Sequence, residues 1–373
     1  ALGVGAGNVQ CIIDEGYDYK VAVPKIITGR SYDYGIICSG EQSIICHKKD
    51  YDAVLKECEA NNCYVVRDDK ERDALRAAIF DDKGNIICFE KPLSLTIDIS
   101  LTIPCDSATV VLPYKNYADG AEIKIYNETD LIFVGVIDEE ISIFNTTGNY
   151  KKYVARSKMA LLLDNQAYPT ELNNVTRTYL GNKYLKDFSI DFDKGEEVYT
   201  GKITVDNGMT VYDIFAEYCD KVFSSLPRMT PKGKLIFYSN IDSEITLSNL
   251  SYTSLIENKK RCEKISKVSL MTNSRFYDYI IENKETKGTS ICRERFLDAS
   301  VGKNVYPENG ENLIENSNLN SYEVQVTCPY NLTYCLGYKC KVESIAEKLQ
   351  VAEIEYSYNS KGEETKLILR RCK

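Results

Sequence analysis

Residues 121–137, AEIKIYNETDLIFVGVI, carry the pattern that decides the fold of most of this chain. Apolar side chains recur with the period of two that a half-buried strand requires, and the polar residues 127–130 between the apolar segments are typical of a turn. The stretch therefore predicts two short strands separated by a turn. The same alternation returns at residues 93–103, 139–144, 322–328, 338–345, 352–358 and 365–371.

Helices are expected at only two places in this strand-rich region. One covers residues 175–188, and the other covers residues 210–223, where Thr210 is a candidate N-cap in front of an apolar stripe. The Asn- and Glu-rich residues 304–320 predict a polar loop. The chain beyond about Asp81 is therefore expected to be mostly β.

The first eighty residues show a different pattern, in which strands alternate with helices. The expected elements are strands over residues 9–14 and 41–46 and helices over residues 19–28, 50–61 and 70–80. This α/β pattern ends in a change of composition near residues 78–90. The fold class expected for the whole chain is α+β, mainly β, with a truncated α/β N-terminal segment.

The composition excludes several classes of protein. The chain has 373 residues, of which 43% are hydrophobic and 27% are charged, and this balance is typical of a folded globular protein. The 46 basic and 55 acidic residues give a net charge of −9, and the two signs alternate along the chain, which argues against a nucleic-acid partner. No apolar run approaches the length of about 18 residues that a membrane span requires.

The 14 cysteines are spaced irregularly along a long chain, which favours reduced thiols over a disulfide framework. Cys335 and Cys340 form a near-pair, but no second pair accompanies them. His47 is the only histidine, and it lies far from both in the sequence. We therefore expect no metal site.

Cys38 is the best candidate for a reactive group. It follows a glycine-containing turn and precedes a β segment, where a strained backbone can leave a thiol accessible and lower its pKa. Residues 3–8 (GVGAGN), 13–15 (IDE) and 35–43 (GIICSGEQS) together resemble the catalytic region of the acylating aldehyde dehydrogenases, including the dehydrogenase half of the bifunctional aldehyde-alcohol dehydrogenases. The resemblance covers about residues 1–80.

The resemblance implies that Cys38 matches the nucleophile, whose thiolate attacks an aldehyde, passes hydride to NAD and leaves a thioester for coenzyme A. The family's cofactor-binding half and its oxyanion-stabilising asparagine would precede Ala1, and the loss of an oxyanion donor alone costs roughly 100- to 1000-fold in rate. We therefore expect a non-functional segment with no cofactor. The alternative is a working acylating dehydrogenase fragment that uses NAD and coenzyme A. His47, beside Lys48 and Lys49, is a weaker candidate for its base than for a solvated surface residue.

The longer remaining region carries a second resemblance. Residues 107–113, 119–126, 131–138 and 155–165 resemble the opening barrel of baseplate hub proteins from phage tails and contractile injection systems. Residues 211–219, 227–229 and 233–237 are similar to that family's helix-then-strand module, and residues 337–344 and 362–369 to its final barrel strands. The order and spacing agree over about residues 85–373.

This second resemblance implies a structural assembly protein without catalysis. The implied domains are an aldehyde dehydrogenase-like fragment (1–80), a first hub-like β-barrel (85–165), a helix–strand module (166–260) and a second hub-like β-barrel (261–373). Its partners would be copies of itself in a ring, usually a trimer, together with tail-tube and spike proteins, with no nucleic acid and no membrane span. It would be located in the bacterial cytoplasm during assembly and then in a tail or virion particle.

The sequence opens at Ala1 without an initiator methionine, so we expect a chain that was processed, trimmed or cut from something longer. The joining of two unlike parts leaves two explanations open. One is a natural gene fusion, and the other is a join of two unrelated coding stretches.

Overall fold

The computed structural model describes residues 9–31, 41–61, 75–146, 148–223, 225–237, 243–271, 276–298 and 307–372. The chain divides into two compact units, Ala1–Ala74 and Leu75–Lys373. None of the helices within the described ranges combines the length and the apolar character of a membrane-spanning segment.

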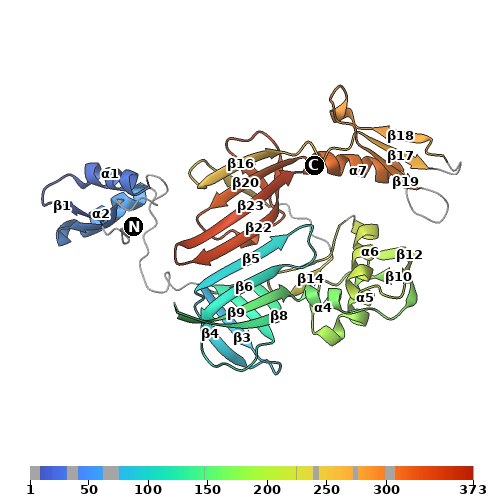
Figure 1. Ribbon diagram of the computed structural model, residues 1–373, viewed down its shortest axis with the longest axis horizontal. Coiled ribbons are helices and arrows are strands. Elements are labelled where there is room, and N and C mark those ends of the chain that lie inside the picture. Colours follow the sequence, from blue (N-terminus) through green and yellow to red (C-terminus); the bar gives the residue numbers. More distant parts are fainter. Residues whose placement is uncertain are drawn as a thin grey trace. The chain divides into compact units, whose positions relative to one another are not determined.

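The first unit is a small α/β arrangement, drawn in blue in Figure 1. Its elements are β1 (Val9–Ile13), α1 (Tyr19–Ser31), β2 (Glu41–Cys46), η2 (Lys48–Asp50) and α2 (Tyr51–Ala60). β1 and β2 pair in parallel, and Val23 and Val54 from the two helices pack against Ile13. The two strands and two helices predicted within residues 9–61 are confirmed.

The two-stranded sheet of this unit is covered by helices on one face. Ile13 and Ile44 belong to the small core, whereas Ile12 and Ile45, which lie opposite one another in the register, are 73% and 45% exposed. Parallel sheets are ordinarily covered on both faces. The described part of the first unit therefore has a core on one side of its sheet only.

The second unit is built on a 13-stranded sheet. In the order of their pairing, its strands are β16 (Ser254–Lys259), β20 (Tyr322–Cys328), β23 (Gly362–Arg371), β22 (Leu349–Asn359), β5 (Ser94–Ser100), β6 (Ser107–Pro113), β9 (Gly148–Ser157), β8 (Asp130–Asn145), β7 (Glu122–Asn127), β3 (Leu75–Phe80) and β4 (Ile86–Glu90). β21 (Lys339–Val342) branches from β22 and pairs on its other side with β15 (Glu244–Leu247).

The pairing of β5 with β22 joins the early and late strands of this sheet, as Figure 1 shows where cyan and red strands meet. Ile97 lies opposite Tyr356, and both are fully buried in one continuous core. Among the described strands, the pairing path runs from β16 to β4 and does not close into a ring.

The helix expected over residues 70–80 is wrong for its described part, because residues 75–80 form β3. This strand lies between β4 and β7 and buries Leu75, Ala77 and Ile79 in the core. Leucine, arginine and alanine favour helices when isolated, but tertiary packing overrides this weak preference. The change of composition near residues 78–90 accordingly lies within paired strands of the second unit.

A helical module follows β9. Its elements are α4 (Met159–Asp164), β10 (Thr170–Thr176), α5 (Arg177–Tyr184), η3 (Lys186–Phe188), β11 (Asp191–Phe192), β12 (Val198–Val205), α6 (Val211–Phe223), β13 (Arg228–Met229) and β14 (Lys234–Ile236). The rings of Phe215 and Tyr218 on α6 pack edge-on against Phe237. Thr210 Oγ1 accepts the Asp213 N–H at 3.2 Å, so the predicted N-cap of this helix is confirmed.

A second small module consists of β17 (Lys267–Met271), β18 (Tyr279–Glu282), η4 (Lys284–Thr286), β19 (Glu294–Asp298) and α7 (Pro307–Asn320), and η5 (Thr333–Cys335) follows β20. The loop predicted over residues 304–320 is wrong for residues 307–320, which form α7. Ile314 on this helix packs against Val268 and Leu270 of β17. Burial of that face stabilises a helix whose asparagines alone would not favour it.

Candidate assembly surfaces

The candidate nucleophile Cys38 lies outside the described residues, so its role stays a prediction. His47 is described and exposed, at the N-cap of η2, and its Nδ1 accepts a hydrogen bond from the Lys49 N–H at 3.3 Å.

The described part of the first unit does not fit NAD at the turn between β1 and α1. A pyrophosphate binds where backbone N–H groups at a helix N-terminus face it. This turn instead carries Asp14, Glu15 and Asp18, and the first and last of these carboxylates accept hydrogen bonds from nearby backbone N–H groups at 2.9 Å. Glu15 forms an ion pair with Lys49, whereas Asp14 and Asp18 occupy backbone N–H groups at the N-terminal end of α1 that a pyrophosphate would need.

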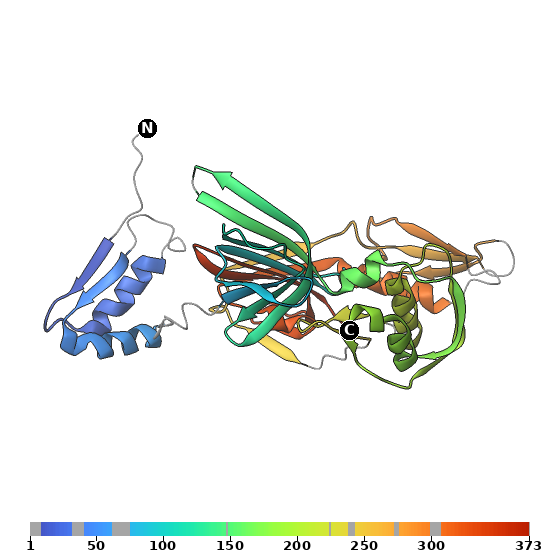
Figure 2. The ribbon, with the colours of Figure 1, turned by 90° about the horizontal axis from the view of Figure 1, so that it is seen from below.

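The hairpin of β8 and β9 extends beyond the strand on its outer side. β7 pairs with β8 only as far as Val136, whereas β9 continues along β8 to Asn145. Figure 2 shows this green hairpin projecting from the sheet. We call residues 138–146 and 148–150 the arm. From Asp138 to Phe144, the outer edge of β8 has no partner strand in the described part of the chain.

The arm exposes apolar side chains to solvent. Ile141 is 37% exposed and Phe144 is 61% exposed. The ring of Phe144 meets that of Tyr114 edge-on, with 4.8 Å between their centroids. An open strand edge with apolar side chains is a template for pairing with another chain.

A buried ion pair fixes the base of the arm. Lys151 Nζ lies 2.6 Å from Glu140 Oε2, and the two side chains are 9% and 18% exposed. The Gly120 N–H donates to the other oxygen of Glu140, and a Cβ at Gly120 would lie 2.6 Å from Ile79 Cγ2. The bulge between Ile137 and Glu139 lies beside this contact, so the point where the arm leaves the sheet is tightly packed.

Sequence reasoning missed this ion pair, although one signal was present. Lys151 occupies an inward position of β9, in phase with the buried Tyr153 and Ala155. A lysine on the apolar side of an alternating strand predicts a buried acidic partner. Which carboxylate supplies it depends on the β8–β9 register, which the local pattern does not give.

The two ends of the sheet are also open among the described strands. β16 pairs only with β20 and leaves Ile256 54% exposed. β4 pairs only with β3, and Phe89, which is 57% exposed, meets Tyr126 edge-on at 6.3 Å. β22 and β23, by contrast, lie inside the sheet and pair on both sides.

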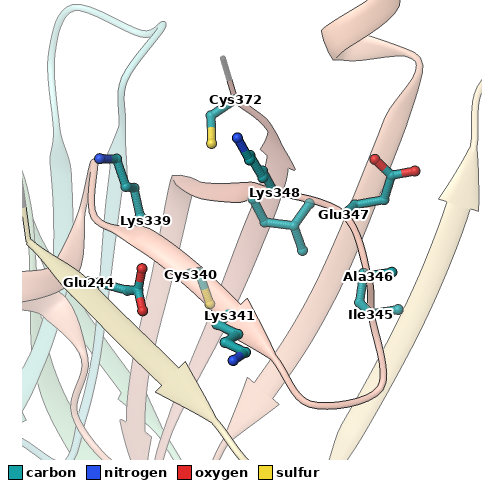
Figure 3. A pocket seen from close by; sticks show the side chains of 10 residues that line it. Glu244, Lys339, Cys340, Lys341, Ile345, Ala346, Glu347, Lys348 and Cys372 are labelled. Carbon is teal, nitrogen blue, oxygen red and sulfur yellow. The ribbon is translucent and has the colours of Figure 1, made fainter.

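A cavity of about 470 Å³ lies beside β21 and is shown in Figure 3. Cys340 and Cys372 line it together with Glu244 and Lys348. Burial raises the pKa of the Cys340 thiol to about 12, so this sulfur is protonated and poorly nucleophilic at neutral pH. Within the described residues, no group of three or more His, Cys, Asp or Glu side chains is arranged to hold a metal ion.

Comparison with curated proteins finds relatives for a small part of the chain. No family model matches. Over 117 residues the chain is 41% identical to succinate-semialdehyde dehydrogenase (acetylating) from Clostridium kluyveri. This match covers 31% of this chain and 26% of the relative. Over 82 residues it is 43% identical to aldehyde-alcohol dehydrogenase from Clostridium acetobutylicum, covering 22% and 9%. The chain thus spans about a quarter or less of the length of these relatives.

Comparison with solved structures finds a match over most of the chain. A tail protein from Neisseria meningitidis MC58 has a TM-score of 0.63 at 14% identity, and the match covers 80% of this chain and 97% of that one. The 43 kDa tail protein of prophage MuSo2 from Shewanella oneidensis has a TM-score of 0.64 at 14% identity, covering 79% and 98%. Both resemblances expected from the sequence are confirmed, as is the α+β, mainly β fold class. The chain has the fold of phage tail proteins over four-fifths of its length, together with a partial aldehyde dehydrogenase-like sequence.

Proposed function

We propose that this chain is a structural protein of a phage-like tail baseplate, a hub that joins the tail tube to the spike. The observation that supports it most strongly is the fold likeness, which takes in nearly the whole length of two tail proteins at TM-scores of 0.63 and 0.64. In this proposal residues 85–165 and 261–373 are the two hub-like barrel regions, and residues 166–260 are the module between them.

The proposed hub acts as a closed ring of identical chains, with three as the expected number. A closed ring covers each open edge with a neighbouring copy and leaves no free end for further growth. The outer edge of β8 and the exposed side chains of the arm supply a surface of the required kind. The protein would assemble in the bacterial cytoplasm and then reside in a tail or virion particle.

The test is the oligomeric state of the full chain, measured by light scattering and native mass spectrometry over a wide range of concentration. We expect a discrete ring, either alone or when tail-tube and spike proteins are added. A monomer at every concentration, with no co-assembly with those proteins, would contradict the proposal.

A second candidate function is CoA-acylating aldehyde oxidation, which the 41% identity to an acetylating dehydrogenase favours. We propose that the first unit does not perform it, because Asp14 and Asp18 already occupy backbone N–H groups at the described turn before α1 that the pyrophosphate of NAD would need. We expect no saturable NAD binding and no aldehyde oxidation dependent on coenzyme A. Turnover that is abolished by Cys38→Ala would show that the segment is an enzyme.

A further inference from the structure

Two adjoining hollows, of about 250 and 280 Å³, lie where β16, β20 and β23 meet the module of β17, β18 and β19. They share Arg261 and Ile291. We call them together the basic groove. Its charged lining consists of Lys259, Arg261, Lys264, Arg293, Arg371 and one carboxylate, Glu285. Five basic side chains thus line this groove with one acidic side chain, on a chain whose net charge is −9.

Three of the five basic side chains already form ion pairs with carboxylates of this chain. Lys264 Nζ lies 2.7 Å from Glu285 Oε2. Arg371 Nη2 lies 2.9 Å from Glu347 Oε1, and Lys259 Nζ lies 3.0 Å from Glu257 Oε1. Carboxylates are therefore the anions that this surface is already arranged to bind.

The two arginines that line the 280 Å³ hollow, Arg261 and Arg293, have no such partner. Arg261 Nη2 donates to Ser290 Oγ at 3.1 Å, and Arg293 Nη1 donates to the Arg261 carbonyl oxygen at 3.0 Å. Within the described residues, no carboxylate pairs with either guanidinium. A guanidinium fork matches a carboxylate in a bidentate geometry, and the bond between the Arg293 side chain and the Arg261 backbone ties the two forks together.

We propose that the basic groove binds an acidic peptide segment of a partner protein, in which Arg261 and Arg293 each take one carboxylate. The Ser290 hydroxyl, which accepts the bond from Arg261, can donate to a carbonyl group of the peptide. Two hollows in succession suit an extended chain with spaced charges better than one compact anion. This inference concerns a separate surface and does not depend on ring formation.

A nucleic acid fits the same groove less well. Glu285 lies among the basic side chains and would repel a phosphate backbone. The aromatic ring in the lining, Tyr322, is covered by the Arg371 guanidinium at 4.8 Å from its centroid, so it offers no free face on which a base could stack.

The experiment measures binding of a fluorescent hexaglutamate peptide to the full chain by anisotropy. The double variant Arg261→Gln/Arg293→Gln should raise Kd at least about tenfold, because each lost charge-assisted bond contributes to affinity. The matched control is Lys83→Gln/Lys361→Gln, which removes the same charge from two exposed turns. It should leave Kd within about twofold. Arg261→Lys/Arg293→Lys should recover only part of the affinity, since an ammonium cannot form the bidentate contact.

Four outcomes would overturn the proposal. The wild-type chain does not bind the peptide, or the control weakens binding as much as the groove variant. Inorganic phosphate displaces the peptide at an equal concentration of charge, which would make the groove a small-anion site. An oligothymidylate binds more tightly than the peptide with the same dependence on Arg261 and Arg293, which would make it a nucleic-acid site. Circular dichroism and thermal unfolding of each variant separate a lost contact from a lost fold.

Discussion

At the scale of single residues, we expect the ion pair of Lys151 and Glu140 to be sensitive to substitution, because both side chains are largely buried. Lys151→Met keeps the volume of the side chain but leaves a buried carboxylate without its cation. We expect the free energy of unfolding to fall by about 3 kcal/mol. Chemical denaturation measures this change. Adding Glu140→Gln should restore part of it, because the neutral amide no longer needs a cation.

The control for this prediction is Lys202→Met, which removes one partner of an exposed ion pair with Glu171. Both side chains are about half exposed, so the loss should stay below about 1 kcal/mol. If both variants lost the same free energy of unfolding, the base of the arm would be accessible to solvent, and the pair of Lys151 and Glu140 would not stabilise it.

The Asp106 carboxyl should make the free energy of unfolding depend on pH. It lies in the connection between β5 and β6, and burial raises its pKa from 3.8 to about 7 although Arg228 opposes the shift. The folded chain therefore holds a proton that the unfolded chain releases in this interval. The group's stabilisation is complete below about pH 4 and is lost as the pH rises to about 7.

Asp106→Asn removes this titration. The difference in unfolding free energy between the variant and the wild type should therefore move in favour of the variant as the pH rises from about 4 to about 7. Urea denaturation at a series of pH values measures it. A constant difference over the whole interval would show that Asp106 ionises normally in the folded chain.

At the scale of elements, the success of sequence reasoning follows the range of the interactions. The strand β7 was predictable because the buried Ile123 and Ile125 alternate with half-buried side chains, and this pattern is local. The pairing of Ile97 with Tyr356 was not predictable, because two strands far apart in the sequence meet with no signal in either. The same holds for the basic groove, whose residues are drawn from 259–371.

The wrong predictions at β3 and α7 have one cause, which is that tertiary packing overrides local preference. β3 begins with leucine, arginine and two alanines, which favour helices, and α7 is rich in asparagine, which does not. The secondary structure of each segment depends on the surface against which it packs. Gly310 in α7 shows this most directly, because a Cβ there would lie 2.6 Å from Ile281 Cδ1, so the absence of a side chain allows the helix to approach the sheet.

The arm gives a prediction at this scale. Ile141→Lys combined with Phe144→Ser should leave the fold intact, because both side chains are exposed, but should weaken self-association at least about tenfold. Sedimentation velocity at several concentrations measures the effect. The control is Leu250→Lys, which changes an 81% exposed side chain in the turn before β16. Unchanged association of the arm variant would exclude the arm from the subunit contact.

At the scale of the whole molecule, the division into two units predicts independent folding. The second unit contains the continuous core of the large sheet, whereas the first has a small core on one side of two strands. Small cores give little stability. Limited proteolysis of the full chain should therefore remove the first unit early and leave a resistant product that begins near Leu75, identified by mass spectrometry. A first cut between β3 and β4 would contradict the division, since these strands pair with one another in the second unit.

The same division predicts where assembly resides. Every open edge and exposed apolar side chain assigned to the proposed ring lies beyond Leu75, so a chain of residues 75–373 should reach the same oligomeric state as the full chain at equal concentration. Its thermal transition should coincide with the main transition of the full chain, because the large core is unchanged. Light scattering and calorimetry of the two chains side by side provide the measurements. If the shorter chain folds but remains a monomer while the full chain assembles, the first unit takes part in the contact, and the uncovered face of Ile12 and Ile45 becomes its first candidate surface.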